Sequence, residues 1–250
     1  MNEPQIIVEE DFSLAWAKAL RTLKNNSWDI WNLVVTIKNP DLENVSAIDK
    51  LTNFAKSKNL IHPEQVLHTI FPQRIYKKVN KGDRKKFYKW YNVYYNDTRK
   101  MPHSNWGTYF KRMINYRTSD GYNYDQLGNI IDHINSRKNN HGASNIIFVP
   151  QIGKDSNRTM GAPCLNYITV QIESNEGNRT VSLLAIYRNH DFRERAFGNY
   201  WGLCKLLKYI CIETDSSIGA ITCISSHAYV DTDKSELHNI ATKILNNDYE

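Results

Sequence analysis

Four short motifs that could do chemistry follow one another in the second half of the sequence. They are Ala162-Pro163-Cys164, Tyr187-Arg188-Asn189-His190-Asp191, Phe197-Gly198-Asn199 and His227-Ala228-Tyr229. A cysteine acts as a nucleophile through its thiolate, and a neighbouring cation promotes the ionisation of the thiol. The simpler role of a cysteine is that of a small buried apolar residue. The pattern therefore raises the question of whether one cysteine of this chain differs from the others.

The chain has four cysteines, and they are Cys164, Cys204, Cys211 and Cys223. None of them forms a CxxC pair, and their spacing with histidine does not match a zinc site, so no metal site is predicted. Cys204, Cys211 and Cys223 lie in apolar surroundings and are expected in the core. The first residues carry no basic region of the kind that begins a signal peptide, so reduced thiols and a cytoplasmic location are expected.

Composition excludes two broad classes of protein. Of the 250 residues, 41% are hydrophobic and 23% are charged, which excludes wholesale disorder. No apolar run reaches the roughly 18–20 residues that span a membrane. The net charge of +6 is concentrated in residues 74–89, which hold eight Lys or Arg and one Asp. Such a segment is typical of a solvated helix face, and binding of nucleic acid through it and the aromatic residues that follow is the alternative.

The periodicity of apolar residues predicts the elements that must position these motifs. It predicts helices over 12–24, 44–57, 63–71, 125–135 and 199–212, and a last helix that begins with a capping box from Asp233 to Glu236. Strands are predicted over 30–37, 146–150, 167–173, 181–187 and 218–225. This mixture predicts an α+β fold, a single domain over residues 1–250 with helices packed on a mixed sheet.

The order and spacing of the motifs resemble the thymidylate synthase and pyrimidine hydroxymethylase family. That family has a Pro-Cys nucleophile, an Arg-Ser-x-Asp signature, an Asn eight residues after that Asp, and His-x-Tyr. Asp191 and Asn199 are also eight residues apart. Upstream, the segments from Gly107 to Lys111 and from Tyr124 to Gln126 are similar to further family motifs. The resemblance covers roughly residues 105–245 and leaves residues 1–104 as a divergent part.

The resemblance implies a role for each of these residues on a pyrimidine nucleotide. Cys164 would add to C6 of the ring, which makes C5 a nucleophile toward a one-carbon electrophile. Arg188 would lie near the thiolate and the phosphate. Asn199 would pair with N3–H and O4 of uracil, and Asp191 would help to hold the base. The substrate would also contact Tyr109, Asn189, His227 and Tyr229.

Two alternatives remain open for these residues on the sequence alone. Asn199 could instead cap a helix, and His227 and Tyr229 could be ordinary strand residues.

The resemblance also bears on the identity of the base. In cytosine-specific relatives the position of Asn199 is typically Asp, so Asn199 favours a uracil-type base.

The sequence departs from the family at several places, which include the absence of an N-terminal Arg-Thr-Gly loop and Leu165 in place of the usual His after the nucleophile. Ser144-Asn145 replaces an Arg-Arg pair that grips phosphate across the dimer, and Arg137, Lys138 or Arg158 could substitute for it. Thr69 stands at the place of a catalytic Glu, and Glu64 is an unaligned replacement. The family closes over 5,10-methylenetetrahydrofolate with a C-terminal tail, whereas this chain stops at residue 250, shortly after Tyr229. The expectation is a homodimeric C5-modifying enzyme, and the alternative is a nucleotide-binding module without turnover.

Overall fold

A computed structural model describes residues 3–98, 107–136, 145–151, 153–155, 161–175 and 177–246. Its helices are α1 (Phe12–Asn25), α2 (Val45–Ser57), α3 (Pro63–Ile70), α4 (Gln73–Tyr76), α5 (Arg84–Thr98), α6 (Tyr109–Ile114), α7 (Gln126–Ser136), α8 (Ala196–Thr214) and α9 (Lys234–Leu245). Its strands are β1 (Gln5–Glu9), β2 (Asp29–Ile37), β3 (Tyr116–Arg117), β4 (Asn123–Tyr124), β5 (Ile146–Phe148), β6 (Leu165–Asn175), β7 (Asn178–Tyr187), β8 (His190–Asp191) and β9 (Ser217–Tyr229).

The main sheet is mixed, as predicted. Its strands run in the order β1-β2-β9-β7-β6-β5, and β8 pairs with β9. The pairs β1/β2, β7/β9 and β8/β9 are parallel, and the others are antiparallel. The hairpin between β6 and β7 turns at Gly177, whose φ of 86° suits glycine. The apolar periodicity did not predict β1, because this edge strand leaves Ile6 and Val8 largely exposed.

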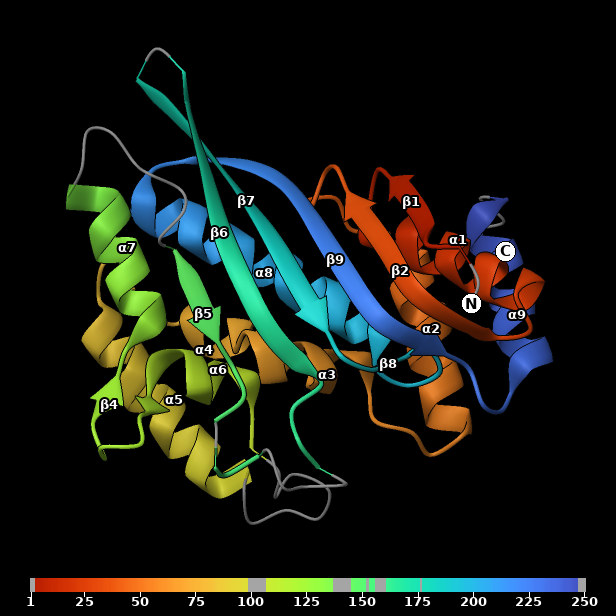
Figure 1. The fold of residues 1–250 in the computed structure, drawn as a ribbon, viewed down its shortest axis with the longest axis horizontal. Coiled ribbons are helices and arrows are strands. Elements are labelled where there is room, and N and C mark those ends of the chain that lie inside the picture. Colours follow the sequence, from red (N-terminus) through yellow and green to blue (C-terminus); the bar gives the residue numbers. More distant parts are fainter. Residues whose placement is uncertain are drawn as a thin grey trace.

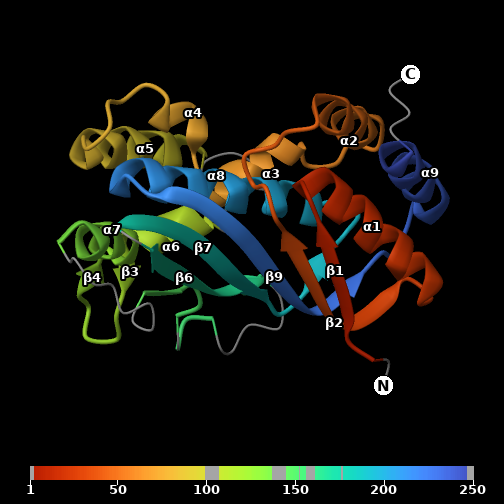
Figure 2. The same ribbon diagram turned by 90° about the horizontal axis from the view of Figure 1, so that it is seen from above.

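Helices cover one face of the sheet. Figures 1 and 2 show α1, α3 and α8 on this side, and α8 runs behind β7 and β9 in the view of Figure 1. Side chains of the covered face alternate with those of the other face, as the pleat requires. Leu33, Ser225, Tyr187 and Leu165 form one register row on the covered face and are all buried. No helix among the described residues lies over the opposite face (Figures 1 and 2).

Close packing between α3 and α8 depends on Gly198. A Cβ at this position would lie 2.6 Å from the carbonyl oxygen of Pro63 and 2.6 Å from Cβ of Val66. Those distances are too short for real carbon contacts, so the two helices can approach this closely only with glycine there. Because Asn199 is the next residue, this contact also sets the depth at which Asn199 enters the protein.

Replacing Gly198 with alanine is expected to destabilise the protein by roughly 1–3 kcal/mol, because overpacking must push α3 away from α8. Urea unfolding monitored by far-UV circular dichroism measures the change. Lys243→Ala on the exposed side of α9 is the control, with an expected change within about 0.5 kcal/mol. A Gly198→Ala protein as stable as the control would contradict the close-packing argument.

The predicted capping box of the last helix is wrong. Asp233 adopts a left-handed conformation with φ of 55°, and its side chain does not cap α9. Its carboxylate instead accepts a hydrogen bond from Nε of Arg193 at 2.8 Å and lies 3.3 Å from Nζ of Lys58. The Asp233 carboxylate therefore pairs with two cations from other parts of the chain instead of capping α9.

Among the residues that the structure describes, no helix has the length and apolar character to cross a bilayer.

Candidate functional site

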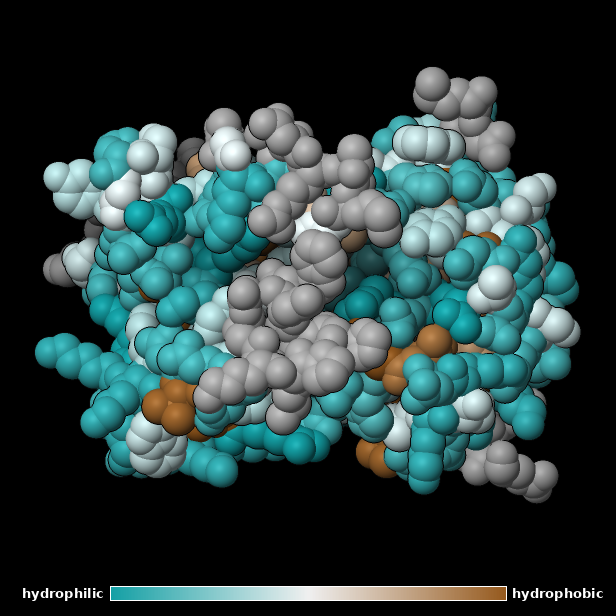
Figure 3. Space-filling view, turned by 90° about the horizontal axis from the view of Figure 1, so that it is seen from below, coloured by the Kyte–Doolittle hydropathy of each residue, from teal (hydrophilic) through white to brown (hydrophobic). Residues whose placement is uncertain are grey.

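The predicted motifs meet at one end of the main sheet. Cys164 directly precedes β6, Arg188 directly follows β7, and β8 and the end of β9 lie beside them. The register pairs that place them are Leu165 with Tyr187, Tyr187 with Ser225, and Asp29 with Tyr229. This is the lower end of the sheet in Figure 1, and Figure 3 views the molecule from that side. The described surface there is largely hydrophilic, with separate hydrophobic spots.

Arg188 holds the segment that carries Cys164. Its Nε donates to the carbonyl oxygen of Pro163 at 3.2 Å, and its Nη2 donates to that of Ala162 at 3.1 Å. Its backbone N–H donates to the carbonyl of Cys164 at 2.9 Å. A guanidinium fork can make both side-chain bonds at once, whereas an ammonium group cannot match that geometry. The arginine therefore fixes the Pro-Cys loop and places a positive charge beside it.

Cys164 differs from the other three cysteines in exposure. It is partly exposed, whereas Cys204, Cys211 and Cys223 are buried, as the sequence predicted. Burial raises the pKa of the Cys164 thiol, and Asp191 raises it further, while Arg188 and Arg195 oppose the increase. The net direction is upward, so the thiol is protonated at neutral pH in the absence of a ligand. Nucleophilic chemistry at Cys164 therefore requires removal of this proton.

Arg195 is a cation near this thiol that the sequence motifs did not indicate. It is the N-cap residue of α8, and its charge acts on both the Cys164 thiol and the Tyr109 phenol. Its side chain is 41% exposed and lies 3.4 Å from the carboxylate of Glu194. The sequence signal that could have indicated Arg195 is its position as a cation between Asp191 and Asn199. Arg137, Lys138 and Arg158, the predicted substitutes for the missing arginine pair, lie outside the described residues.

Tyr109 also reaches the predicted nucleophile. It opens α6, whose N-cap Thr108 accepts a hydrogen bond from the backbone N–H of Lys111 at 3.1 Å. The phenol lies within reach of the backbone N–H groups of Leu165 and Cys164. Burial nevertheless raises the pKa of Tyr109 to about 12, so the phenol is neutral and can donate a hydrogen bond.

His227 and Tyr229 lie side by side at the end of β9, and their rings stack at 5.3 Å. Both nitrogens of His227 have partners, since Nδ1 lies 2.7 Å from Oδ1 of Asn189 and Nε2 lies 2.9 Å from Oδ2 of Asp29. The half-exposed ring of Trp31 stacks on His227 at 4.6 Å. Tyr229 in turn hydrogen-bonds Asn189. The strand ends thus form a polar cluster, in which His227 and Tyr229 both belong to β9.

Asp191 is only partly available to a ligand. One carboxylate oxygen accepts hydrogen bonds from the backbone N–H groups of Arg193 at 2.8 Å and Glu194 at 3.4 Å. Burial raises the pKa of this carboxyl, and these backbone donors oppose the increase. The second oxygen has no hydrogen-bond partner among the described residues. The backbone N–H groups of Arg193 and Glu194 therefore orient the Asp191 carboxylate.

Asn199 does not cap a helix, because α8 begins at Ala196 and Asn199 lies inside its first turns. The side chain is 3% exposed, and its Nδ2 lies 3.1 Å from Nε2 of His190. Nδ1 of His190 lies 2.8 Å from Oγ of Ser225. The structure therefore removes the helix-cap alternative and places the Asn199 amide in a buried polar chain at the site.

The pH dependence of stability is expected to report on His190. Burial lowers the pKa of His190 from its ordinary value of 6.5 to about 3. Between these values the unfolded chain binds the proton and the folded protein does not, so stability falls as pH decreases from about 6.5 towards 3. The loss is on the order of several kcal/mol, since each pKa unit corresponds to about 1.4 kcal/mol.

Urea midpoints between pH 7 and pH 4 measure this effect, and His190→Phe is expected to have a shallower slope than the native protein. His133→Phe on α7 is the control and should keep the native slope. Equal slopes for the native and His190→Phe proteins would show that His190 is not a buried neutral group.

Neither candidate for the family's catalytic Glu is connected to Cys164 by a described contact. The Thr69 hydroxyl donates to the carbonyl oxygen of Val66 at 2.7 Å, within α3. The Glu64 carboxylate forms an ion pair with Arg74 and lies 3.9 Å from Nε2 of His68. Both polar groups therefore have local partners, and Glu64 as a replacement for the family's acid stays a prediction.

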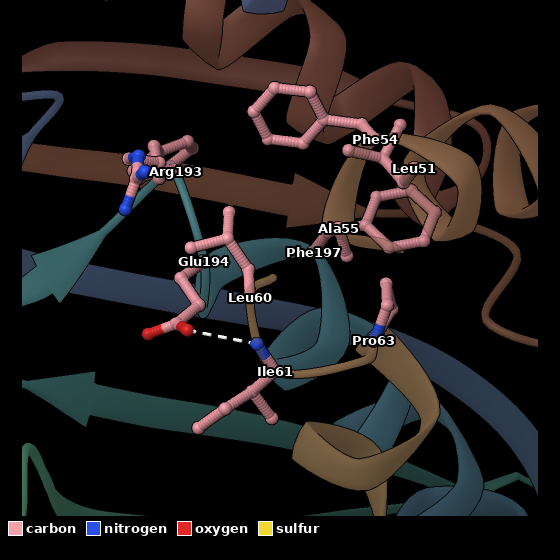
Figure 4. A pocket seen from close by; sticks show the side chains of 10 residues that line it. Leu51, Phe54, Ala55, Leu60, Ile61, Pro63, Arg193, Glu194 and Phe197 are labelled. Carbon is pink, nitrogen blue, oxygen red and sulfur yellow. Dashed lines mark hydrogen bonds between the residues drawn. The ribbon is translucent and has the colours of Figure 1, made fainter. Parts of the chain in front are cut away.

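A cavity of about 10 Å³ lies beside the turn after β8, and Figure 4 shows its mainly apolar lining. Phe54, Phe197 and Leu60 line it, and Oε1 of Glu194 accepts a hydrogen bond from the backbone N–H of Ile61 at 2.9 Å. That volume holds at most one water molecule. It is too small for a nucleotide and is not a substrate site. No group of three His, Cys, Asp or Glu in the described parts of the chain could hold a metal ion.

The basic segment 74–89 is partly neutralised by the rest of the protein. Arg74 pairs with Glu64, Lys81 pairs with Asp215, and Arg84 pairs with Asp132. On α5, Lys85, Lys86 and Lys89 are exposed, whereas Phe87 and Tyr91 are buried. This arrangement is typical of a solvated helix with an aromatic core face. Nucleic-acid binding by the exposed lysines stays a prediction.

Comparison with known proteins shows relatives with one shared name, "Putative thymidylate synthase". The chain is 30% identical to the protein of Methanococcoides burtonii over 132 residues, which cover 52% of this chain and 56% of the relative. It is 26% identical to that of Methanosarcina barkeri over 134 residues (53% and 57%) and 30% identical to that of Methanocaldococcus jannaschii over 129 residues (50% and 56%). The chain thus spans a little over half the length of these curated relatives. No protein-family model matches it.

These relatives confirm the resemblance that the motifs indicate, to a divergent thymidylate synthase-like family.

Proposed function

We propose that this protein binds a uracil-type pyrimidine nucleotide and activates C5 of the base through a covalent bond between Cys164 and C6. The observation that carries the proposal is the clamp of Arg188 on the Pro163-Cys164 segment, beside a partly exposed thiol. The names of the relatives point to the same class of reaction.

The proposed chemistry proceeds through an adduct. After loss of the thiol proton, the Cys164 thiolate adds to C6, and the electron pair of the C5–C6 double bond moves through C5 to O4, giving an enolate. C5 then takes a proton from water. Loss of the original C5 hydrogen and expulsion of the thiolate restore the ring. The net result is exchange of the C5 hydrogen with solvent, and a one-carbon electrophile would enter at the enolate stage.

Separate residues would recognise the base, the sugar and the phosphate of the nucleotide. Asn199 would read the N3–H and O4 edge, because an amide offers a donor and an acceptor side by side. Asn189, His227 and Tyr229 form a connected cluster that suits a sugar hydroxyl. Arg188 is the matching cation for a phosphate oxygen.

The described residues after β9 do not fit a folate that closes over the site. Helix α9 packs against α1, away from β6, which Cys164 precedes (Figure 2). The proposed chemistry is therefore the action of Cys164 on the base, without 5,10-methylenetetrahydrofolate.

The direct test is incubation of the protein with 5-fluoro-2′-deoxyuridine monophosphate, followed by intact-protein and peptide mass spectrometry. Fluorine at C5 withdraws electrons and makes C6 more reactive toward the thiolate, so the adduct at C6 is expected to accumulate and is captured by rapid acid quenching. A mass increase of one nucleotide on the peptide that contains Cys164 supports the proposal. Absence of an adduct, or its location on another cysteine, contradicts it.

A nucleotide-binding module without turnover is the second candidate function. The local engagement of Thr69 and Glu64, and the upward pKa of the Cys164 thiol, favour it. Titration calorimetry with pyrimidine and purine nucleotides, together with a C5-hydrogen exchange assay on dUMP, separates the two functions. Binding without exchange supports the module, and measurable exchange rejects it.

We also propose that two copies associate through the face of the main sheet that no described helix covers. One register row crosses this face and contains Ile6, Val34, Ile224, Ile186, Tyr167 and Phe148. Ile6 is 72% exposed and Phe148 is 51% exposed. A contiguous apolar row of this kind is typical of an interface.

Ile224→Lys is expected to convert the dimer to a monomer, because it places a charge at the centre of that row. Sedimentation equilibrium measures the change, and Val93→Lys on the exposed side of α5 is the control. A native protein that stays monomeric at high micromolar concentration would contradict the dimer.

A further inference from the structure

His190 is the most enclosed polar group at the site. It is 1% exposed, and its ring stacks on Tyr187 with 4.3 Å between centroids and an interplanar angle of 2°. The rings of Phe192 and Tyr200 each lie 5.4 Å away on its edges. This packing fixes the plane of the imidazole, and the hydrogen bonds of its two nitrogens distinguish the two orientations that a 180° flip of the ring would exchange.

The two nitrogens connect Asn199 to Ser225. Nε2 lies 3.1 Å from Nδ2 of Asn199, and Nδ1 lies 2.8 Å from Oγ of Ser225. A neutral imidazole has one donor and one acceptor. When Nε2 accepts from the Asn199 amide, the proton must lie on Nδ1 and be donated to Ser225. A further hydrogen bond between Ser225 and the Cys223 thiol gives the serine hydroxyl hydrogen another partner.

We propose that His190 is a positioning residue that holds the Asn199 amide in a single orientation and thereby sets which pyrimidine edge the site accepts. This inference rests on the proposed function, in which Asn199 reads the base. The hydrogen bond between Ser225 and Cys223 favours a proton on Nδ1, and with the proton there a turned-over amide would place Oδ1 against the Nε2 lone pair of His190. That arrangement places two acceptors together in a buried site and is strongly disfavoured.

The consequence is selection between uracil and cytosine. Uracil presents a donor at N3–H and an acceptor at O4, whereas cytosine presents an acceptor at N3 and a donor at its amino group. A freely rotating amide could match either edge by exchanging its oxygen and nitrogen. An amide that is held by His190 matches one edge and leaves unpaired polar groups against the other, and such mismatches cause large losses of affinity. The held orientation selects the uracil edge.

The test compares affinities of the full chain for dUMP and dCMP by titration calorimetry. His190→Phe keeps an aromatic ring against Tyr187 and removes both nitrogens, and His190→Gln restores a side-chain acceptor. The native protein is expected to prefer dUMP by roughly 100-fold, and His190→Phe to reduce this ratio below about 10-fold. His190→Gln should recover part of the preference. His133→Phe on α7 should keep the native ratio.

A His190→Phe protein that folds and keeps the native dUMP-to-dCMP ratio would overturn the inference while leaving the proposed function intact. If His190→Phe does not fold, Ser225→Ala replaces it, with Ser13→Ala as the matched buried control. Loss of the Nδ1 partner should then lower the ratio, and an unchanged ratio overturns the inference.

If the native protein binds neither nucleotide, the proposed function and the selection of the pyrimidine edge fail together, and the imidazole ¹⁵N shifts of His190 then decide only whether His190 holds the Asn199 amide. A proton on Nδ1 supports the held amide, and a proton on Nε2 overturns it.

Discussion

Replacing Cys164 with alanine is expected to reduce C5-hydrogen exchange of dUMP by at least about 10⁴-fold and to abolish the adduct with the 5-fluoro analogue. No other described cysteine can take its place, because Cys204, Cys211 and Cys223 are buried. Burial raises the pKa of Cys211 to about 12 and shifts those of Cys204 and Cys223 in the same direction. Those thiols are neither accessible nor ionised.

Exchange is measured as release of tritium from C5-labelled dUMP. Cys204→Ala is the matched control, since it removes a thiol from α8 and should leave the rate within about threefold of native once its stability is checked. Calorimetry of Cys164→Ala with dUMP shows whether binding persists without the thiol. Native-level exchange in Cys164→Ala would disprove covalent catalysis at this residue.

Replacing Arg188 with glutamine is expected to lower the exchange rate by about 100-fold, because it removes a charge that favours the thiolate and an anchor of the Pro-Cys loop. The pKa of the Cys164 thiol is already raised by burial, and loss of the Arg188 charge should raise it further. The thiolate fraction should then decrease at each pH.

Alkylation of Cys164 by iodoacetamide between pH 6 and pH 9 tests the electrostatic part directly. The native rate should increase about tenfold per pH unit over this range, because the pKa of the thiol lies above it. Arg188→Gln should be slower at each pH, and Arg188→Lys should be intermediate because it keeps the charge and loses the fork.

Arg193→Gln is the control for this series, since Arg193 pairs with Asp233 rather than with the Cys164 segment. Equal alkylation rates for the native and Arg188→Gln proteins would contradict an electrostatic role of Arg188.

Contacts between neighbouring segments could be predicted from the sequence. The strands predicted over 167–173 and 181–187 follow each other closely in the chain, and their pairing as a hairpin returns Arg188 to the start of the strand that follows Cys164. Helix α8 was predicted because a long apolar run is typical of a buried helix. These elements depend on residues close together along the chain, so local patterns were sufficient.

Contacts between distant segments required the fold. Asp29 and His227 meet because β2 pairs with β9, and no local pattern specifies that pairing or its register. Arg195 lies near Cys164 only because the end of β7 and the start of α8 converge there. The capping motif at Asp233 was predicted wrongly because long-range ion pairs with Arg193 and Lys58 outweighed the local pattern.

By itself, the sequence determined the chemical groups of this protein: a Pro-Cys thiol, an Arg-Asn-His-Asp motif, an Asn eight residues further on, and the family that these resemble. The tertiary structure decided which of these groups are accessible, which are held by a partner, and which are charged. It showed that burial raises the pKa of the Cys164 thiol and that the Asn199 amide is hydrogen-bonded to a buried His190. The physical reason is that burial and hydrogen-bond partners act between residues far apart in the chain, and only packing brings those residues together.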